Sequence, residues 1–385
     1  MTINAPKGFR AAGLAAGIKE SGAKDLTLVV NDGPLDAAAG VFTRNKVKAA
    51  PVLWSQQVLS TGRAKAVVLN SGGANACTGP EGFQDTHATA EHVAETLGIG
   101  AIDVAVCSTG LIGARLPMDK LKAGVTKAAE QLAATPEAGR DAAEGVMTTD
   151  TVPKQAQVSG DGWTIGGFAK GAGMCAPNMA TMLSVLTTDA VLDQPDLDKA
   201  LRQAVDATFN SLDVDGGTST NDTLLLLCSG ASGVTPTVAE FTQKLTEICH
   251  DLVKQLQADA EGVTKHVTIT VTGAATDAEA HAAAKVVAQD NLCKTAFFGS
   301  DPNWGRVAMA VGNAPTEFDG GKLDITINGI PVCVNGSLGE DRGKADLSGR
   351  DITVEIDLHA GQGTATVLTT DLSHGYVEEN SAYSS

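Results

Sequence analysis

Short apolar runs typical of β-strands alternate with segments of helical periodicity along most of this chain, and this alternation limits the fold more than any other feature. Residues 26–30 and 66–70 have the length and the Val and Leu content of strands. Residues 84–97 have helical spacing, and residues 236–260 form a long amphipathic pattern that begins at a proline. The alternation predicts a mixed α/β protein.

Several antiparallel strands are expected towards the end of the chain. The expected strands are 104–107, 266–271, 322–327, 352–356 and 365–368, and the other expected helices are 117–132 and 197–208. The strands 352–356 and 365–368 are expected to pair as a hairpin. No repeat or low-complexity linker separates the elements, so the domain boundary is placed within 235–275. This gives a main α/β domain, 1–235, and a C-terminal α/β region, 236–385.

The composition describes a globular chain with a core of small aliphatic side chains. The 385 residues are 43% hydrophobic but only 4% aromatic, and 43 of them are glycine. A chain of this length is expected to form two or three domain-sized units. The net charge of −17 lies entirely after residue 180, since residues 1–180 carry sixteen basic and sixteen acidic side chains. A solvated acidic surface is the simplest interpretation.

The charge and the cysteine pattern exclude several classes of protein. No basic patch stands out, which argues against nucleic acid and anionic membranes as partners. The N-terminus lacks an apolar signal-peptide core, and no apolar run approaches the roughly 18–20 residues of a membrane helix. The seven cysteines are widely spaced and do not cluster with histidines, so reduced thiols and no metal site are expected. A cytoplasmic location follows as an expectation.

The segment 170–183, KGAGMCAPNMATML, is the most unusual part of the chain. Two glycines and a proline shape the backbone before a short apolar run. One interpretation is structural: the loop caps a helix, with Thr181 as the N-cap worth about 1 kcal/mol, or it leads into a buried strand. The other interpretation is chemical and needs the hydroxyl of Thr181 beside the small residue Ala180.

A threonine hydroxyl is a weak nucleophile unless a base removes its proton. Cleavage of the Ala180–Thr181 bond by an N→O acyl shift would give Thr181 a free α-amino group beside its own hydroxyl. The reference pKa of such an amine is about 7.7–8.0, which suits a general base at neutral pH. The small Ala180 leaves space around the carbonyl under attack, and the glycines permit a strained loop.

Eight segments, taken in order, resemble the bifunctional glutamate N-acetyltransferase family, also called ornithine acetyltransferases. The first is the segment 170–183 itself, which resembles the self-cleavage segment of that family. The others are NSGGANAC at 70–77, CSTGLIG at 107–113, TTDT at 148–151, NDT at 221–223, AEGVTK at 260–265, GSDPNWGR at 299–306 and YVEENSAYSS at 376–385. The resemblance covers essentially the whole chain.

The resemblance implies roles for individual residues. Thr181 matches the nucleophile, first for cleavage after Ala180 into fragments 1–180 and 181–385, and then for acetyl transfer. Thr109 and Gly110 match the oxyanion-hole pair, which agrees with a glycine turn at a strand end. Five positions match residues that hold the amino-acid substrate: Thr148, Lys170, Glu261, Asn380 and Ser385. Lys170 suits a substrate carboxylate and Glu261 suits an ammonium group.

The implied activity is transfer of the acetyl group of N²-acetyl-L-ornithine to L-glutamate through an acetyl-threonine intermediate. The implied fold is a layered α-β-β-α sandwich resembling the self-processing aminopeptidases, and the implied assembly is a heterotetramer of two of each fragment. No cofactor is expected, and acetyl-CoA stays open as a second donor. A self-processing amidase or aminopeptidase, in which water resolves the acyl-enzyme, is the alternative enzyme. A non-catalytic small-molecule binding protein is the alternative from another class.

Overall fold

The computed structural model describes residues 2–176 and 182–382, and the chain divides into two compact units. Of the described residues, the first unit comprises 2–176, 182–210 and 218–256, and the second comprises 211–217 and 257–382. The change of unit thus comes later than residue 235, because helix α6 (Val238–Ala258) packs on the first unit. Phe241 of α6 stacks on Trp163, and Gln255 exchanges hydrogen bonds with the backbone of Gln155.

Two sheets form the centre of the first unit. The four-stranded sheet has the order β1-β2-β4-β5, with β1 (Phe9–Leu14), β2 (Leu26–Asn31), β4 (Ala66–Ser71) and β5 (Val104–Thr109). Its pairs are antiparallel except for β4 and β5, which are parallel. The five-stranded sheet has the order β3-β9-β8-β7-β6, with β3 (Ala37–Phe42), β9 (Thr223–Cys228), β8 (Leu183–Thr188), β7 (Thr164–Lys170) and β6 (Lys154–Ser159).

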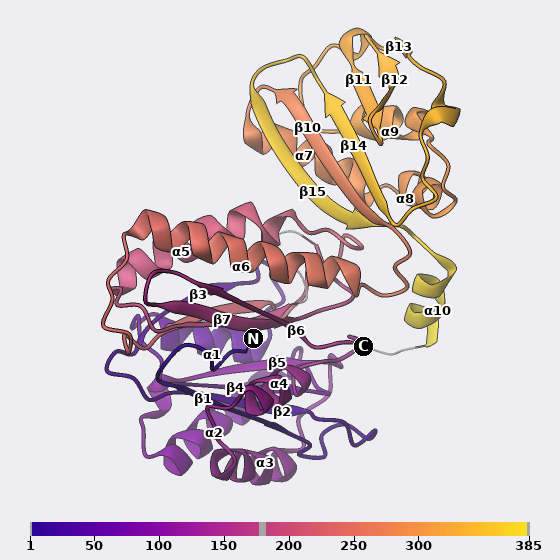
Figure 1. Cartoon of the computed structure of the whole chain (residues 1–385). Helices are drawn as coiled ribbons and strands as arrows, with labels where there is room; N and C mark the ends of the chain where they lie inside the picture. The colour runs from indigo at the N-terminus through magenta and orange to yellow at the C-terminus, as the bar shows by residue number, and fades with distance from the viewer. Residues whose placement is uncertain (1, 177–181, 383–385) are drawn as a thin grey trace. The chain divides into compact units, whose positions relative to one another are not determined.

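Helices cover the outer faces of the two sheets. Figure 1 shows α5 and α6 over the five-stranded sheet, and α2 and α3 over the four-stranded sheet. The helices of this unit are α1 (Ala50–Leu59), α2 (Gly79–Leu97), α3 (Met118–Glu130), α4 (Pro136–Glu144), α5 (Gln194–Ala207) and α6. The expected α-β-β-α layering, with a smaller C-terminal α/β unit, is confirmed.

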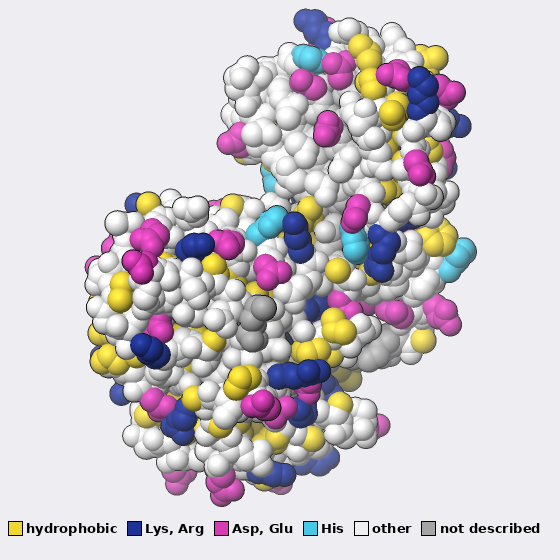
Figure 2. Space-filling model, in the orientation of Figure 1, with side chains coloured by type: hydrophobic (Ala, Val, Ile, Leu, Met, Phe, Trp, Pro, Cys, Tyr) yellow, Lys and Arg dark blue, Asp and Glu magenta, His cyan; other side chains and the backbone are white. Residues whose placement is uncertain are grey.

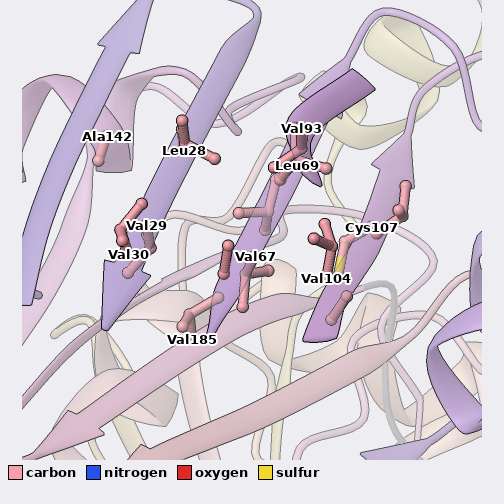
Figure 3. Packing of buried hydrophobic residues seen from close by; sticks show 14 of the residues in the cluster. Leu28, Val29, Val30, Val67, Leu69, Val93, Val104, Cys107, Ala142 and Val185 are labelled. Atoms are coloured by element: carbon pink, nitrogen blue, oxygen red, sulfur yellow. The ribbon is translucent and has the colours of Figure 1, made fainter. Parts of the chain in front are cut away.

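A continuous apolar core lies between the two sheets. All six residues of β2, β4, β5, β8 and β9 are buried, because each of these strands lies inside its sheet or under a layer of helices. In Figure 3, Val185 of β8 lies beside Val67 of β4 and Val30 of β2, so the side chains of the two sheets interlock. The paucity of aromatic residues agrees with this core of Val, Leu and Ala, which lets the sheets approach closely.

The second unit is a six-stranded sheet packed against helices. The strand order is β13-β12-β11-β14-β10-β15, with β10 (His266–Ala274), β11 (Asp324–Ile327), β12 (Ile330–Val334), β13 (Ser337–Leu338), β14 (Asp351–Asp357) and β15 (Gly363–Thr370). Its helices are α7 (Asp277–Gln289), α8 (Asn291–Phe298), α9 (Trp304–Val311) and α10 (His374–Ala382). Strand β14 alternates buried and exposed residues, and β10 alternates buried and partly buried residues, as expected for a sheet with one covered face.

The predicted hairpin between 352–356 and 365–368 is wrong. Strand β10 lies between β14 and β15, parallel to the former and antiparallel to the latter. The connecting loop therefore passes across the end of β10, where Leu358 and Ala360 donate backbone hydrogen bonds to Thr272 and Gly273. Gly361 is required in this loop, because a Cβ there would lie 2.4 Å from the Ala274 carbonyl oxygen.

None of the helices within 2–176 and 182–382 is long and apolar enough to cross a membrane. On the face drawn in Figure 2, Lys and Arg side chains are scattered among Asp and Glu side chains. All seven cysteines are free thiols, and six of them are buried.

Candidate active site

The turn after β5 carries two of the residues expected to form an oxyanion hole. Thr109 is the last residue of the strand and is only 3% exposed, and its carbonyl accepts a hydrogen bond of 3.0 Å from the Gly73 amide. Gly110 has φ +123°, and a Cβ there would lie 2.6 Å from the Gly73 nitrogen. Glycine is therefore required at 110 by both the backbone conformation and the lack of space.

Lys170, from the five-stranded sheet, contacts this turn. It is the last residue of β7 and is 2% exposed, and its Nζ donates a hydrogen bond of 3.1 Å to Oγ1 of Thr109. Two of the residues predicted from the sequence are thus in direct contact, although 61 positions separate them. The hydroxyl accepts from the ammonium group with a lone pair, so its own proton stays free to be donated elsewhere.

Asp150 is a buried anion that the sequence analysis did not single out. Its Oδ1 accepts hydrogen bonds from Lys154 Nζ at 2.5 Å and from the Gly171 amide at 2.8 Å, and its Oδ2 accepts one from the Thr148 amide at 3.0 Å. Asp150 thereby holds the backbone of the half-buried Thr148 and of Gly171, the residue after Lys170. The TTDT run at 148–151 contains this one charged group, but its burial and its partners depend on the fold.

Electrostatics keep Asp150 ionised. Burial disfavours the carboxylate, but the cations of Lys170 and Lys154 and the Thr148 amide outweigh it and lower the pKa of Asp150 from 3.8 to about 2. The pKa of Asp150 is lower in the folded protein than in the unfolded chain, so the ionised carboxylate stabilises the fold fully above about pH 5. This contribution to the free energy of unfolding is roughly 2 kcal/mol, and it is lost as the pH falls through about 2.

Replacement of Asp150 by Asn should destabilise the protein by about 3–5 kcal/mol, because two buried ammonium groups lose their counter-charge. Urea unfolding at pH 7 measures this loss. The exposed Asp161→Asn is the matched control and should change stability by less than about 0.5 kcal/mol. Equal stabilities of the two variants would show that the buried ammonium groups of Lys154 and Lys170 do not need Asp150 as a counter-charge.

A buried amide network holds the turn after β5. Asn221, which directly precedes Asp222, donates from Nδ2 to the carbonyls of Ala74 at 2.6 Å and Ser108 at 2.8 Å. The Ser108 hydroxyl donates to Asn70 Oδ1, and Asn70 Nδ2 donates to the Gly73 carbonyl. These hydrogen bonds hold the backbone around the turn after β5. Because Asn221 precedes β9 of the five-stranded sheet, that sheet helps to fix the position of Thr109 and Gly110.

The expected cleavage site, Ala180 and Thr181, lies outside the described residues, as does Ser385. On its C-terminal side the chain enters β8 at Leu183, which is a buried strand and not a helix. The interpretation of Thr181 as a helix N-cap is therefore wrong, because no helix follows it.

Glu261 and Asn380 belong to the second unit and contact each other there. Asn380, in α10, donates from Nδ2 to Glu261 Oε2 at 2.9 Å. Burial raises the pKa of the nearby Glu379, and the charge of Glu261 raises it further. Acidic groups that repel one another in this way form a favourable place for a cation.

The loop that carries Glu261 is held by buried polar contacts. Asp371 accepts hydrogen bonds from the amides of Thr264 at 2.9 Å and Lys265 at 2.8 Å. Lys265 Nζ donates to three successive carbonyls, those of Leu347, Ser348 and Gly349. The loop is therefore fixed on both sides, which gives Glu261 a defined position.

Gly262→Ala is expected to displace α10 from this loop. Gly262 has φ +61°, and a Cβ there would lie 2.0 Å from the Tyr376 amide nitrogen. We expect a loss of about 1–3 kcal/mol and faster hydrogen exchange of the α10 amides. Gly320→Ala is the control, since a Cβ there meets no atom within 4 Å. Unchanged exchange in α10 would show that the helix does not depend on this contact.

Across 2–176 and 182–382, no three His, Cys, Asp or Glu side chains gather closely enough to bind a metal ion. Four predicted residues, Thr109, Gly110, Thr148 and Lys170, lie in the first unit, whereas Glu261 and Asn380 lie in the second. Within each group the structure brings predicted residues into contact.

Comparison with known proteins places this chain among close relatives. A model of the ArgJ family matches residues 10–385. The arginine biosynthesis bifunctional protein ArgJ of Mycolicibacterium paratuberculosis is 62% identical over 389 aligned residues, which cover 100% of this chain and 96% of that protein. The protein of the same name from Streptomyces coelicolor is 57% identical over 385 residues, with 100% of both chains covered.

Among solved structures, ornithine acetyltransferase of Mycobacterium tuberculosis, crystallised with ornithine, is 63% identical and covers 47% of this chain and 96% of its own, with a TM-score of 0.46. The family model matches nearly the whole chain, and relatives with more than half of their residues identical cover all of it. The resemblance inferred from the eight segments is thus confirmed, and the chain belongs to the ArgJ family.

Proposed function

We propose that this protein is a glutamate N-acetyltransferase that moves the acetyl group of N²-acetyl-L-ornithine to L-glutamate. The observation that carries the proposal is the hydrogen bond from the buried Lys170 ammonium group to the Thr109 hydroxyl, beside Gly110. A hydroxyl polarised by a cation in a buried site is a strong donor for a developing oxyanion. The names of the relatives, which describe arginine biosynthesis, support the same reaction.

Thr181 is the proposed nucleophile, made competent by cleavage after Ala180. Its hydroxyl attacks the acetyl carbonyl while its α-amino group takes the hydroxyl proton, and Thr109 and Gly110 stabilise the tetrahedral oxyanion. The α-amino group then gives this proton to the departing ornithine nitrogen. Glutamate reverses the sequence: its amine attacks the acetyl-threonine ester, and the threonine oxygen regains a proton.

The polar groups of each unit suit amino-acid substrates. Lys170 is proposed to pair with a substrate carboxylate and Glu261 with an ammonium group, while Thr148, Asn380 and Ser385 orient the substrate. Acetyl-CoA would reach the same threonine as a second donor, and no cofactor takes part. The two cleaved fragments are proposed to stay together and to pair as a heterotetramer in the cytoplasm.

Acceptor dependence tests the proposal. With N-acetylornithine as donor, release of ornithine should require glutamate and should yield one N-acetylglutamate for each ornithine. Steady release of ornithine and free acetate without glutamate would instead identify an amidase, in which water resolves the acyl-enzyme. Binding of N-acetylornithine without release of ornithine under either condition would identify a non-catalytic binding protein.

A further inference from the structure

Lys19, in the loop between β1 and β2, is a half-buried lysine whose ammonium group bonds to the backbone. Its Nζ donates hydrogen bonds to the carbonyl oxygens of Lys24 at 3.0 Å and of Met147 at 2.6 Å. Lys24 belongs to the same loop, whereas Met147 lies 128 positions further along the chain. Lys19 therefore links its own loop to the segment that leads into Thr148.

The peptide group between Met147 and Thr148 is held at both of its polar ends. Its carbonyl oxygen accepts the hydrogen bond from Lys19, and its N–H donates to Asp150 Oδ2 at 3.0 Å. In a planar trans peptide the carbonyl and the N–H point to opposite sides of the chain. A cation and an anion thus hold one rigid plane from opposite sides, and hydrogen bonds to charged groups are the strong ones.

The loop that carries Lys19 is itself fixed by the buried Asp25. One carboxylate oxygen of Asp25 accepts the amides of Ile18 at 2.6 Å and Lys19 at 2.9 Å, and the other accepts the Ala16 amide at 2.6 Å. The Asp25 carbonyl accepts the Ser71 amide at 2.9 Å. Since Ser71 is the last residue of β4, the loop is attached to the sheet that carries the oxyanion turn.

The aliphatic part of the Lys19 side chain lies beside that turn. A Cβ on Gly72 would lie 3.1 Å from Lys19 Cγ, and a Cβ on Gly110 would lie 2.8 Å from the carbonyl carbon of Gly72. Gly72 therefore lies between Lys19 and Gly110. Burial lowers the pKa of Lys19, and the charge of Lys170 lowers it further, so the two ammonium groups interact. Lys19 is thus part of the surroundings of the candidate site.

We propose that Lys19 is a positioning residue for the amino-acid substrate and acts through Thr148, whose preceding peptide group it holds. This inference rests on the function proposed above, in which Thr148 orients the substrate. Without the ammonium group, the Met147 carbonyl loses its partner and the Thr148 side chain loses its fixed direction. The oxyanion pair keeps its separate support from Lys170 and Asn221, so the effect falls on substrate binding and not on the rate of the bound complex.

Lys19→Met tests this role, because methionine keeps an unbranched side chain beside Gly72 but has no ammonium group. We expect KM for N-acetylornithine to rise about 10-fold, with kcat changed by less than about 2-fold. Lys120→Met is the matched control. The exposed Lys120 donates to the Gly17 carbonyl of the same loop at 2.9 Å, so its loss removes the same kind of bond without affecting Met147. Both kinetic constants of the control should equal those of the wild type.

A double-mutant cycle separates positioning from a general structural role. Thr148→Val removes the hydroxyl and should also raise KM. If Lys19 acts through Thr148, adding Lys19→Met to Thr148→Val should raise KM by less than about a further 2-fold. Calorimetric titration with ornithine measures the Kd of the wild type, both single variants and the double variant without turnover, and thermal unfolding measures their stability.

Each outcome decides the proposal. A wild-type KM in Lys19→Met would overturn it, and so would single losses that multiply in the double variant, because Lys19 would then act independently of Thr148. Loss of cooperative thermal unfolding in Lys19→Met would also overturn it by assigning a purely structural role. A wild-type protein that binds ornithine but transfers no acetyl group would refute the proposed function alone, since the titrations still decide the role of Lys19. A wild-type protein that does neither would refute both.

Discussion

Thr181→Ala is expected to stay a single chain of 39.1 kDa and to transfer no acetyl groups. Both proposed steps use the Thr181 hydroxyl, first as the nucleophile on Ala180 and then as the nucleophile on the donor. Without it, the α-amino group that acts as base is never formed. The loss of activity should reach the detection limit of the assay, because a missing nucleophile leaves no alternative route.

The measurement is denaturing electrophoresis with N-terminal sequencing, beside a steady-state assay. Wild-type protein should give two fragments, the second beginning at Thr181 and carrying the whole net side-chain charge of −17. Thr181→Ser keeps a hydroxyl and should retain part of both activities. Thr366→Ala, an exposed position on β15, should cleave and turn over as wild type. Normal turnover by Thr181→Ala would contradict the assignment of the nucleophile.

Thr109→Val is expected to lower kcat by roughly 10²–10³-fold with a modest change in KM. Valine keeps the shape of threonine but removes the hydroxyl that accepts from Lys170 and is proposed to donate to the oxyanion. The loss therefore falls on the transition state and not on substrate binding. Thr109→Ser restores the hydroxyl and should recover most of the rate.

A Lys170 variant complements the Thr109 variant in this test. Lys170→Met should raise KM through loss of the substrate carboxylate contact, and it should also lower kcat, because the cation polarises Thr109. Since the two side chains are in contact, the double variant should lose less than the product of the single losses. A Thr109→Val enzyme with wild-type kcat and a raised KM would make Thr109 a binding residue and refute its role in the oxyanion hole.

Local sequence patterns were enough to locate many elements of the fold. Residues 26–30 and 66–70 lie within β2 and β4, and 236–260 contains α6. In these segments the periodicity of apolar residues agrees with which residues are buried in the folded protein. Strand pairing is different, because it depends on partners distant in the chain. Strand β10 separates β14 from β15, and nothing within residues 351–370 indicates that insertion.

The candidate site shows the same limit. Thr109, Gly110 and Lys170 were named from motifs, but the contact between Thr109 and Lys170 comes from folding of two sheets. Asp150 and Asn221 were missed because their importance comes from burial and from partners elsewhere in the chain. The Asn221 amide reaches Ser108 across 113 positions, and no local pattern predicts such a contact.

The central claim is that an acetyl group rests on Thr181 between donor and acceptor. Intact-mass spectrometry of the purified protein, before and after mixing with N-acetylornithine in the absence of glutamate, tests it most directly. The fragment 181–385 should gain the mass of one acetyl group, the fragment 1–180 should not change, and addition of glutamate should remove the label. An unlabelled fragment 181–385 in a preparation that transfers acetyl groups would contradict the acyl-enzyme account.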